Sequence, residues 1–194
     1  MTIATTIIRD EHRALASVVK GLQFLIQEIQ NRGQSPDFPL LQSIVSYIEQ
    51  FPDKLHHPKE DQYLFPALRQ RHPAAAADLD ILEAEHQLGA DVTARVIESL
   101  RAYQADPSQF EAFARAVDEY ANFHWAHMSR EETVILPLAE KYLTQQDWVS
   151  INAAFKSNSD PLVGINTQRE FRELFRRLVN LIPAPHGLGA ERPR

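Results

Sequence analysis

The chain of 194 residues contains no cysteine, which excludes disulfides, thiolate metal sites, iron–sulfur clusters and thiol catalysis. Glycine is scarce, at 6 residues, whereas the helix formers Ala, Leu, Glu and Gln are plentiful, and this composition favours helices. No run approaches the ~20 apolar residues of a membrane-spanning helix. The first residues also lack the basic and apolar regions of a secretory signal. We therefore expect a cytoplasmic protein that does not insert into a membrane.

A strong excess of positive charge is also missing. The formal net charge is −6, and no stripe of Lys and Arg is obvious, which argues against nucleic acid or an anionic membrane as a partner. A chain of this length suits one domain, or one domain with an appendage, and can bury a core without disulfides. The sequence leaves the oligomeric state open.

What the sequence does contain is a helical apolar period. Residues on one face of a helix recur at spacings of three and four in four stretches, and most of them are apolar. The stretches are residues 8–29, 44–55, 79–100 and 113–138, and we call this inward face of each predicted helix its seam. Breaks rich in Pro, Gly and Asp separate them, at residues 31–39, 71–78 and 105–109. No alternating strand pattern stands out. The sequence therefore predicts an all-α fold, an up-down-up-down four-helix bundle.

Beyond this bundle, one or two additional helices are expected, at residues 145–158 and 167–182. Each predicted helix begins with a pair typical of a helix start, Thr144 with Asp147 and Thr167 with Glu170. We therefore divide the chain into a bundle, residues 1–143, and a C-terminal helical extension with a loose tail, residues 144–194.

Two prolines, Pro58 and Pro66, fall inside the second predicted helix, in the segment LHHPKEDQYLFPAL (Leu55–Leu68). An interior proline lacks the amide donor and clashes with the carbonyl four residues earlier. We expect a kink around residues 54–58, or two half-helices, next to the paired histidines.

Ionisable side chains occupy seam positions of the predicted helices. They are His12, His86, His124, His127 and Glu131, joined by His56 and Glu60 on the kinked helix. Burying such groups costs several kcal/mol each unless something compensates them, and imidazoles and carboxylates are good ligands for iron, manganese or zinc. Two pairs, His56/Glu60 and His127/Glu131, have the i, i+4 spacing that places both side chains on one helix face. Carboxylates from two helices could then bridge two metal ions, with histidines capping each ion.

Four segments carry these residues: EH at Glu11–His12, HHPKED at His56–Asp61, EAEHQ at Glu83–Gln87 and HMSREETVILPLAE at His127–Glu140. Together, over roughly residues 6–142, they resemble the metal-bearing segments of the hemerythrin-like (HHE cation-binding) family. The resemblance implies a non-haem site for two iron ions, joined by an oxo or hydroxo bridge, with zinc or manganese as substitutes. Its metal ligands would be His12, His56, Glu60, His86, His127 and Glu131, the glutamates being the bridges. An open iron position would bind O₂, NO or peroxide.

The sequence departs from the oxygen-carrying members at one position. Those members have HxxxH on the third helix, whereas Ala90 stands four residues after His86 here, so one imidazole is missing and reversible O₂ storage is less certain. His124 either supplies the missing ligand or, as the pattern favours, packs in the core or hydrogen-bonds a ligand. His57 is expected on the flank, because adjacent helical residues lie about 100° apart; a shift of register would instead make it the ligand.

These observations favour a protein that binds or senses a small diatomic or oxidant over a catalyst. A ferritin-like di-iron oxidase or peroxidase is the alternative, but such sites use Glu-x-x-His on two helices, and the chain has one, Glu83 to His86. Repair of iron centres ranks lower, because relatives with that role carry a cysteine-bearing module. An iron-sensing module whose helices rearrange on metal loss is a further alternative.

Overall fold

The structure is a computed structural model that describes residues 2–157, 174, 176–178 and 180. Within these residues it is helical throughout and contains no strand, as predicted. The α-helices are α1 (Ile3–Arg32), α2 (Phe38–Gln50), α3 (His57–Lys59), α4 (Phe65–Arg71), α5 (Ala76–Ala105), α6 (Phe110–Arg130), α7 (Leu136–Tyr142) and α8 (Gln145–Lys156). Wider π-helical turns occur at Pro52–His56, Glu60–Leu64 and Glu131–Ile135, and 3₁₀ turns at Pro73–Ala75 and Pro107–Gln109.

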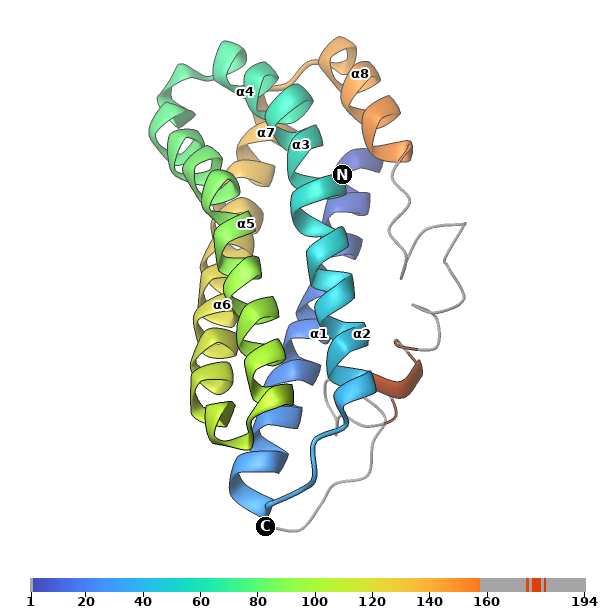
Figure 1. Cartoon of the computed structure of the whole chain (residues 1–194). Helices are drawn as coiled ribbons and strands as arrows, with labels where there is room; N and C mark the ends of the chain where they lie inside the picture. Colours follow the sequence, from blue (N-terminus) through green and yellow to red (C-terminus); the bar gives the residue numbers. More distant parts are fainter. Residues whose placement is uncertain (1, 158–173, 175, 179, 181–194) are drawn as a thin grey trace.

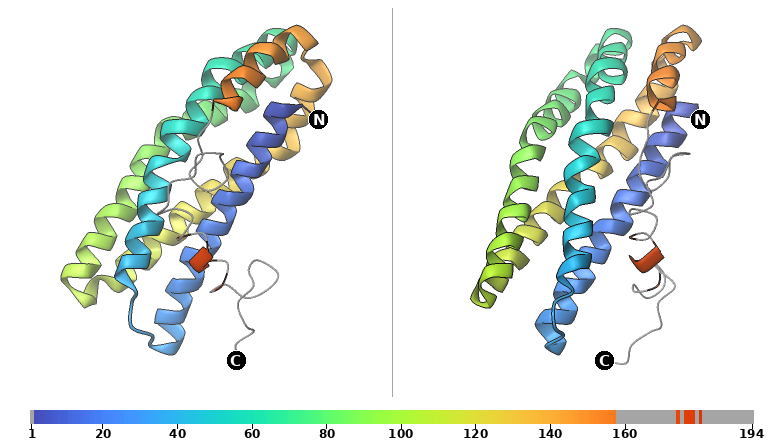
Figure 2. Two further views of the ribbon diagram at one scale, coloured as in Figure 1. Left: turned by 90° about the vertical axis from the view of Figure 1, so that its right-hand side faces the viewer. Right: turned by 45° about the vertical axis from the view of Figure 1, so that its right-hand side comes forward.

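Four long helical segments lie side by side (Figures 1 and 2). The first segment is α1, the second runs from α2 through α4, the third is α5, and the fourth comprises α6 and α7. The connections between them lie at alternating ends of the molecule, and α8 packs beside the N-terminal part of α1 (Figure 1). In the part of the chain that the structure describes, no helix combines the length and apolarity needed to cross a membrane.

Short polar motifs set the helix ends. Gly33 closes α1 with a φ of 62°, a left-handed conformation that glycine adopts without a steric penalty. The helix start predicted at Thr144 and Asp147 is a capping box that opens α8. At the third break, Asp106 accepts a hydrogen bond from the Ser108 backbone N–H and starts a 3₁₀ turn rather than an α-helix. The helix start predicted at residues 167–170 lies outside the described residues.

Each π turn is followed by a proline at the second residue beyond its end, Pro58, Pro66 and Pro137. Proline has no N–H, and its ring crowds the carbonyl four residues earlier, so a wider turn before it relieves the contact. The interruption predicted at residues 54–58 is therefore a π turn, in which the His57 N–H bonds to the Pro52 carbonyl. The turn in the fourth segment, before Pro137, was not predicted.

The hydrophobic core is divided into two clusters. One contains Leu22, Tyr47, Val96 and Phe113, and the other contains Ile8, Phe65, Leu82, Leu136 and Phe155. The ligand candidates of the first three long segments fall between the parts that contribute to the two clusters, as His12 does between Ile8 and Leu15. The bundle thus has a polar layer inside an otherwise apolar interior.

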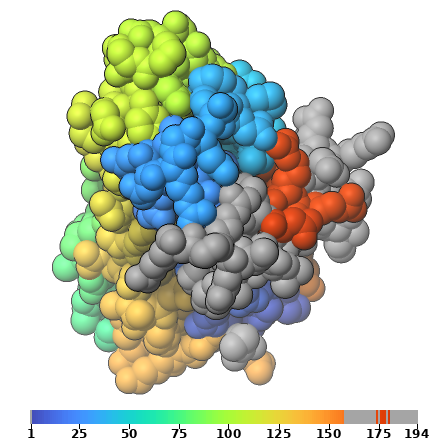
Figure 3. Space-filling model, turned by 90° about the horizontal axis from the view of Figure 1, so that it is seen from below, coloured from blue at the N-terminus to red at the C-terminus, as the bar shows by residue number. Residues whose placement is uncertain are grey.

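A few residues of the C-terminal extension are described, and they lie beside α1 and α2. Leu174 and Leu178 are buried in the first core cluster, and Arg177 forms an ion pair with Asp37, N to O 2.6 Å. Figure 3 shows this part of the chain against the light blue surface of α2. Most of the second helix predicted in the extension, residues 167–182, and the loose tail lie outside the described residues.

Candidate metal centre

The six ligand candidates from the sequence meet in the polar layer. Among the described residues, donor atoms of His12, His56, Glu60 and Glu131 lie within 4.8 Å of one another, and so do those of Glu60, His86, His127 and Glu131. All six side chains are buried, with Glu60 and Glu131 at 0% exposure. The two groups share both glutamates, so the layer offers two adjacent positions for metal ions.

The shared glutamates stand between the histidines. Glu60 directs Oε1 toward His56 Nε2 at 3.2 Å and Oε2 toward His86 Nε2 at 3.6 Å. Glu131 Oε2 lies 3.0 Å from His12 Nε2 and 3.6 Å from His127 Nε2. Each carboxylate therefore faces one histidine of each group, which is the placement that a bridging ligand requires.

The expectation that His57 lies on the flank of the bundle is wrong. His57 is 4% exposed, and one of its ring nitrogens lies within 4.8 Å of those of His86 and His127. The π turn Pro52–His56 is the physical reason, because its extra residue per turn changes the angle between neighbouring side chains from that of a regular α-helix. Both His56 and His57 consequently point inward, one toward each metal position.

Each of the four histidines of the two groups, and His57 as well, has a carboxylate oxygen close to Nδ1. The five pairs are His12 with Glu132 at 2.9 Å, His56 with Glu11 at 2.7 Å, His57 with Asp53 at 3.2 Å, His86 with Asp61 at 2.7 Å and His127 with Glu85 at 2.9 Å. We call Glu11, Asp53, Asp61, Glu85 and Glu132 the outer carboxylates. An ionised carboxylate only accepts hydrogen bonds, so Nδ1 of the four hydrogen-bonded histidines, His12, His56, His86 and His127, carries the proton and leaves the Nε2 lone pair free to bind a metal. The His57 and Asp53 atoms are close but do not form a hydrogen bond.

When no metal is bound, protons on the histidines take the place of the metal ions. Burial lowers the pKa of His12, but hydrogen bonds with Glu131 and Glu132 outweigh burial and raise it to about 9. Burial also opposes the charge on His56 and His86, yet the pKa of His56 is raised well above its usual value by Glu60 and Glu11, and that of His86 is raised by Asp61 and Glu60. Histidinium therefore neutralises the carboxylates when cations are absent.

Two other buried histidines behave in the opposite way. Burial and the neighbouring His86 and His127 lower the pKa of His57 well below its usual value. Burial and the charge on His127 lower the pKa of His124 to about 3. Both rings are therefore neutral, and a neutral imidazole is the form that binds a metal.

His124 nevertheless lies apart from the ligand groups. It is 0% exposed, and neither ring nitrogen has a hydrogen-bond partner. Its ring packs on Tyr120, with centroids 4.3 Å apart, and lies 6.4 Å from the ring of His57. Among the described residues, His124 belongs to none of the groups that could hold an ion, so the geometry favours a packing role over ligation.

The unpartnered atoms show that the residues present fit a pair of metal ions. Nε2 of His12, His56, His86 and His127 and both oxygens of Glu60 and Glu131 are buried without a hydrogen bond of normal geometry. Buried polar atoms of this kind cost about 1–3 kcal/mol each when unsatisfied. All of them face the two metal positions, and imidazole with carboxylate is a donor set suited to iron, manganese and zinc. Cations at these positions would satisfy every one of the atoms.

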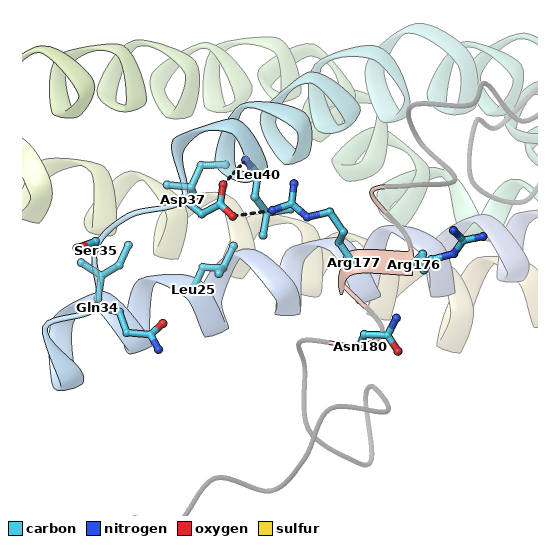
Figure 4. A pocket seen from close by; sticks show the side chains of 10 residues that line it. Leu25, Gln34, Ser35, Asp37, Leu40, Arg176, Arg177 and Asn180 are labelled. Carbon is cyan, nitrogen blue, oxygen red and sulfur yellow. Dashed lines mark hydrogen bonds and ion pairs between the residues drawn. The ribbon is translucent and has the colours of Figure 1, made fainter.

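A surface pocket of about 450 Å³ lies elsewhere, between the α1–α2 connection and the described C-terminal residues. Figure 4 shows Arg177 reaching across it to Asp37, whose other oxygen accepts from the Leu40 backbone N–H at 3.0 Å. No histidine is among its described lining residues. This pocket is therefore separate from the metal centre.

Comparison with known families agrees with the geometry. The hemerythrin HHE cation-binding domain matches residues 4–139, a range that contains every histidine and carboxylate of the centre. The chain belongs to this family. The match ends before α8 (Gln145–Lys156), so the last described helix lies beyond the matched region of this hemerythrin-like chain.

Its curated relatives include an uncharacterized protein of Mycobacterium bovis and two of Mycobacterium tuberculosis. Each is 27% identical over 148 residues, which are 75% of this chain and 57% of the relative. The hemerythrin-like chain thus spans little more than half the length of these relatives. No solved structure matches it.

Sequence reasoning missed the outer carboxylates and the position of His57. A signal for most of the outer carboxylates was present, because four dipeptides, Glu11–His12, Glu60–Asp61, Glu85–His86 and Glu131–Glu132, each place two ionisable residues side by side. Adjacent helical residues lie about 100° apart. In each dipeptide, one member therefore faces the metal positions and the other faces a neighbouring helix.

Proposed function

We propose that this hemerythrin-like chain is a non-haem di-iron protein that binds or senses a small diatomic or oxidant, O₂, NO or peroxide. The bundle, residues 1–143 in up-down-up-down order, would hold the irons, and residues 144–194 would form an extension. His12, His56, Glu60, His86, His127 and Glu131 would be metal ligands, as the sequence suggests, and His57 would be a further one. When bound, the iron pair would supply the electrons and the open coordination position for the exogenous ligand.

The observation that carries the proposal is the unequal number of donors at the two positions. His12 and His56 face one position with the two glutamates. His86 and His127 face the other with the same glutamates, and a ring nitrogen of His57 lies within 4.8 Å of theirs. Two imidazoles with carboxylate and open positions are the donor set of non-haem iron sites that react with O₂. The ligand would therefore bind at the His12/His56 position.

The surroundings of that position suit a small apolar molecule. The ring of His56 lies 5.9 Å from that of Phe51 and 6.3 Å from that of Phe155, and both phenylalanines are almost fully buried. Apolar rings beside the position disfavour charged and strongly hydrated molecules. Diatomic gases and peroxide are small enough to enter through thermal motion of the side chains.

Metal analysis and visible absorption test the proposal. Purified full-length chain, loaded anaerobically with Fe²⁺, should retain two irons, and NO or O₂ should then produce a charge-transfer band. His12→Ala should reduce the iron content and the band, whereas His72→Ala should change neither, because His72 stacks on Tyr142 outside the centre. A protein that binds no iron, or loaded protein that stays colourless with both gases, would refute the proposal.

A further inference from the structure

The outer carboxylates connect the four long segments in a closed ring. Glu132 of the fourth segment bonds His12 of the first, and Glu11 of the first bonds His56 of the second. Asp61 of the second segment bonds His86 of the third, and Glu85 of the third bonds His127 of the fourth. Each segment thus supports the histidine of the next. Within the second segment, Asp53 lies 3.2 Å from His57 Nδ1 without a hydrogen bond.

This ring places a large negative charge around the metal positions. Five outer carboxylates lie at hydrogen-bonding or ion-pairing distance from five histidines, in addition to the two glutamates that face both positions. Glu11 has a side chain only 1% exposed, and Glu85 is 20% exposed. Charges in such surroundings are screened far less than charges in water.

A carboxylate that accepts the Nδ1 proton makes the imidazole a stronger electron donor at Nε2. Stronger donors and nearby negative charge stabilise a metal ion in its more highly charged state, and charge, hydrogen bonding and burial are the levers that set the reduction potential of protein-bound iron. Here the negative charge and the hydrogen bonds both favour the oxidised state, and burial of Glu11 and of the histidines leaves that charge weakly screened.

We propose that the four outer carboxylates of the ring, Glu11, Asp61, Glu85 and Glu132, are positioning residues that bias the bound irons toward their oxidised state. This inference rests on the proposed iron centre. Reversible O₂ storage requires that the electrons passed to O₂ return to the metals when O₂ leaves. A centre whose oxidised form is stabilised resists that return, so the ring favours one-way reaction with an oxidant, followed by reduction from an electron donor, over storage.

Charge-removing substitutions test the ring. Glu11→Gln, Glu85→Gln, Glu132→Gln and Asp61→Asn keep an oxygen that can accept the Nδ1 proton but remove the negative charge. In iron-loaded full-length chain, a redox titration should show higher midpoint potentials in these variants, with two irons retained. For Glu11→Gln we expect about a tenfold larger equilibrium constant for reduction, which is about 59 mV for a one-electron step. Smaller shifts are expected for Asp61→Asn and Glu132→Gln, whose side chains are 38% and 40% exposed.

The matched control is Glu83→Gln. Glu83 lies on α5 two residues before Glu85, pairs with Arg69 at 2.9 Å and is bonded to none of the histidines. Removing its charge should leave the potential unchanged. Because Glu11 is buried, Glu11→Gln could fail to fold, and the partly exposed Glu132→Gln and Asp61→Asn then decide the question.

The possible failures can be told apart. If the variants keep two irons but titrate at the same potential as Glu83→Gln, the ring has no redox role and the inference is overturned. If the variants lose iron instead, the carboxylates only hold the imidazoles in place, and the inference is also overturned. Absence of iron from the unaltered protein would overturn the proposed function, and this inference with it.

Discussion

His57 and His86 stack face to face, with ring centroids 4.2 Å apart and planes inclined by 11°. The two residues come from different long segments, and the third segment has Ala90 rather than a second histidine four residues after His86. We propose that this imidazole of α3 serves in place of the one missing from α5. The second member of the HH pair, rather than His124, completes the group around His86 and His127.

Replacement of His57 tests whether it is a metal ligand. His57→Ala should weaken metal binding at the His86/His127 position by at least about 10-fold, because loss of a ligand costs no less than loss of the outer partners of ligands, for which about 10–100-fold is typical. The measurement is metal content and affinity by competition with a chelator. His72→Ala serves as the control, and unchanged affinity in His57→Ala would show that His57 is not a ligand.

Replacement of His124 separates packing from ligation. His124 is buried without a partner for either ring nitrogen, and removing an unpartnered polar group in favour of an apolar one is neutral or stabilising. His124→Leu should therefore retain full metal content, with a free energy of unfolding unchanged or higher by about 1 kcal/mol. Loss of metal in this variant would instead make His124 a ligand.

The metal-free protein should lose stability as the pH rises above neutrality. The pKa of His12 is raised from 6.5 to about 9, so its contribution is fully present below pH 6.5 and disappears as the pH rises through 9. The pKa values of His56 and His86 are raised too and act in the same direction. Urea unfolding between pH 6.5 and 9 should show the decline in metal-free protein and little of it after metal loading, because metal replaces these protons.

On the acid side, the sign reverses for His57 and His124. Their pKa values are lowered, so their contribution is present above about pH 6.5 and is lost as the pH falls. The metal-free protein should accordingly be most stable near that pH. A stability that is flat from pH 5 to 9 would contradict the charge states derived for the centre.

Phe155 of α8 tests whether the helix beyond the family match protects the centre. Phe155 is fully buried beside His56, and α8 is held to the bundle by Asn152, which accepts from the Ala4 N–H at 2.8 Å. Phe155→Ala should lower the free energy of unfolding by about 3–5 kcal/mol and speed removal of iron by a chelator. Val149→Ala is the control, because Val149 is 62% exposed on the same helix. Equal rates of iron removal in the two variants would show that α8 does not shield the metals.

The sequence by itself determined the helical class, the breaks and the inward position of His12, His56, His86, His127, Glu60 and Glu131. These features follow from local rules, because a period of three and four residues defines one helix face, and proline and glycine mark where regular helix stops. The capping box of Thr144 and Asp147 is local in the same way.

Only the tertiary structure decided that His57 joins His86 and His127, and which carboxylate lies beside each histidine of the centre. His57 turns inward because a π turn shifts the helix register, and the energy of that turn depends on packing around Pro52 and Pro58 rather than on periodicity. The pairs of outer carboxylate and histidine between segments join residues 25 to 120 positions apart. Their formation depends on how four helices rotate against one another, which no local pattern in one chain specifies.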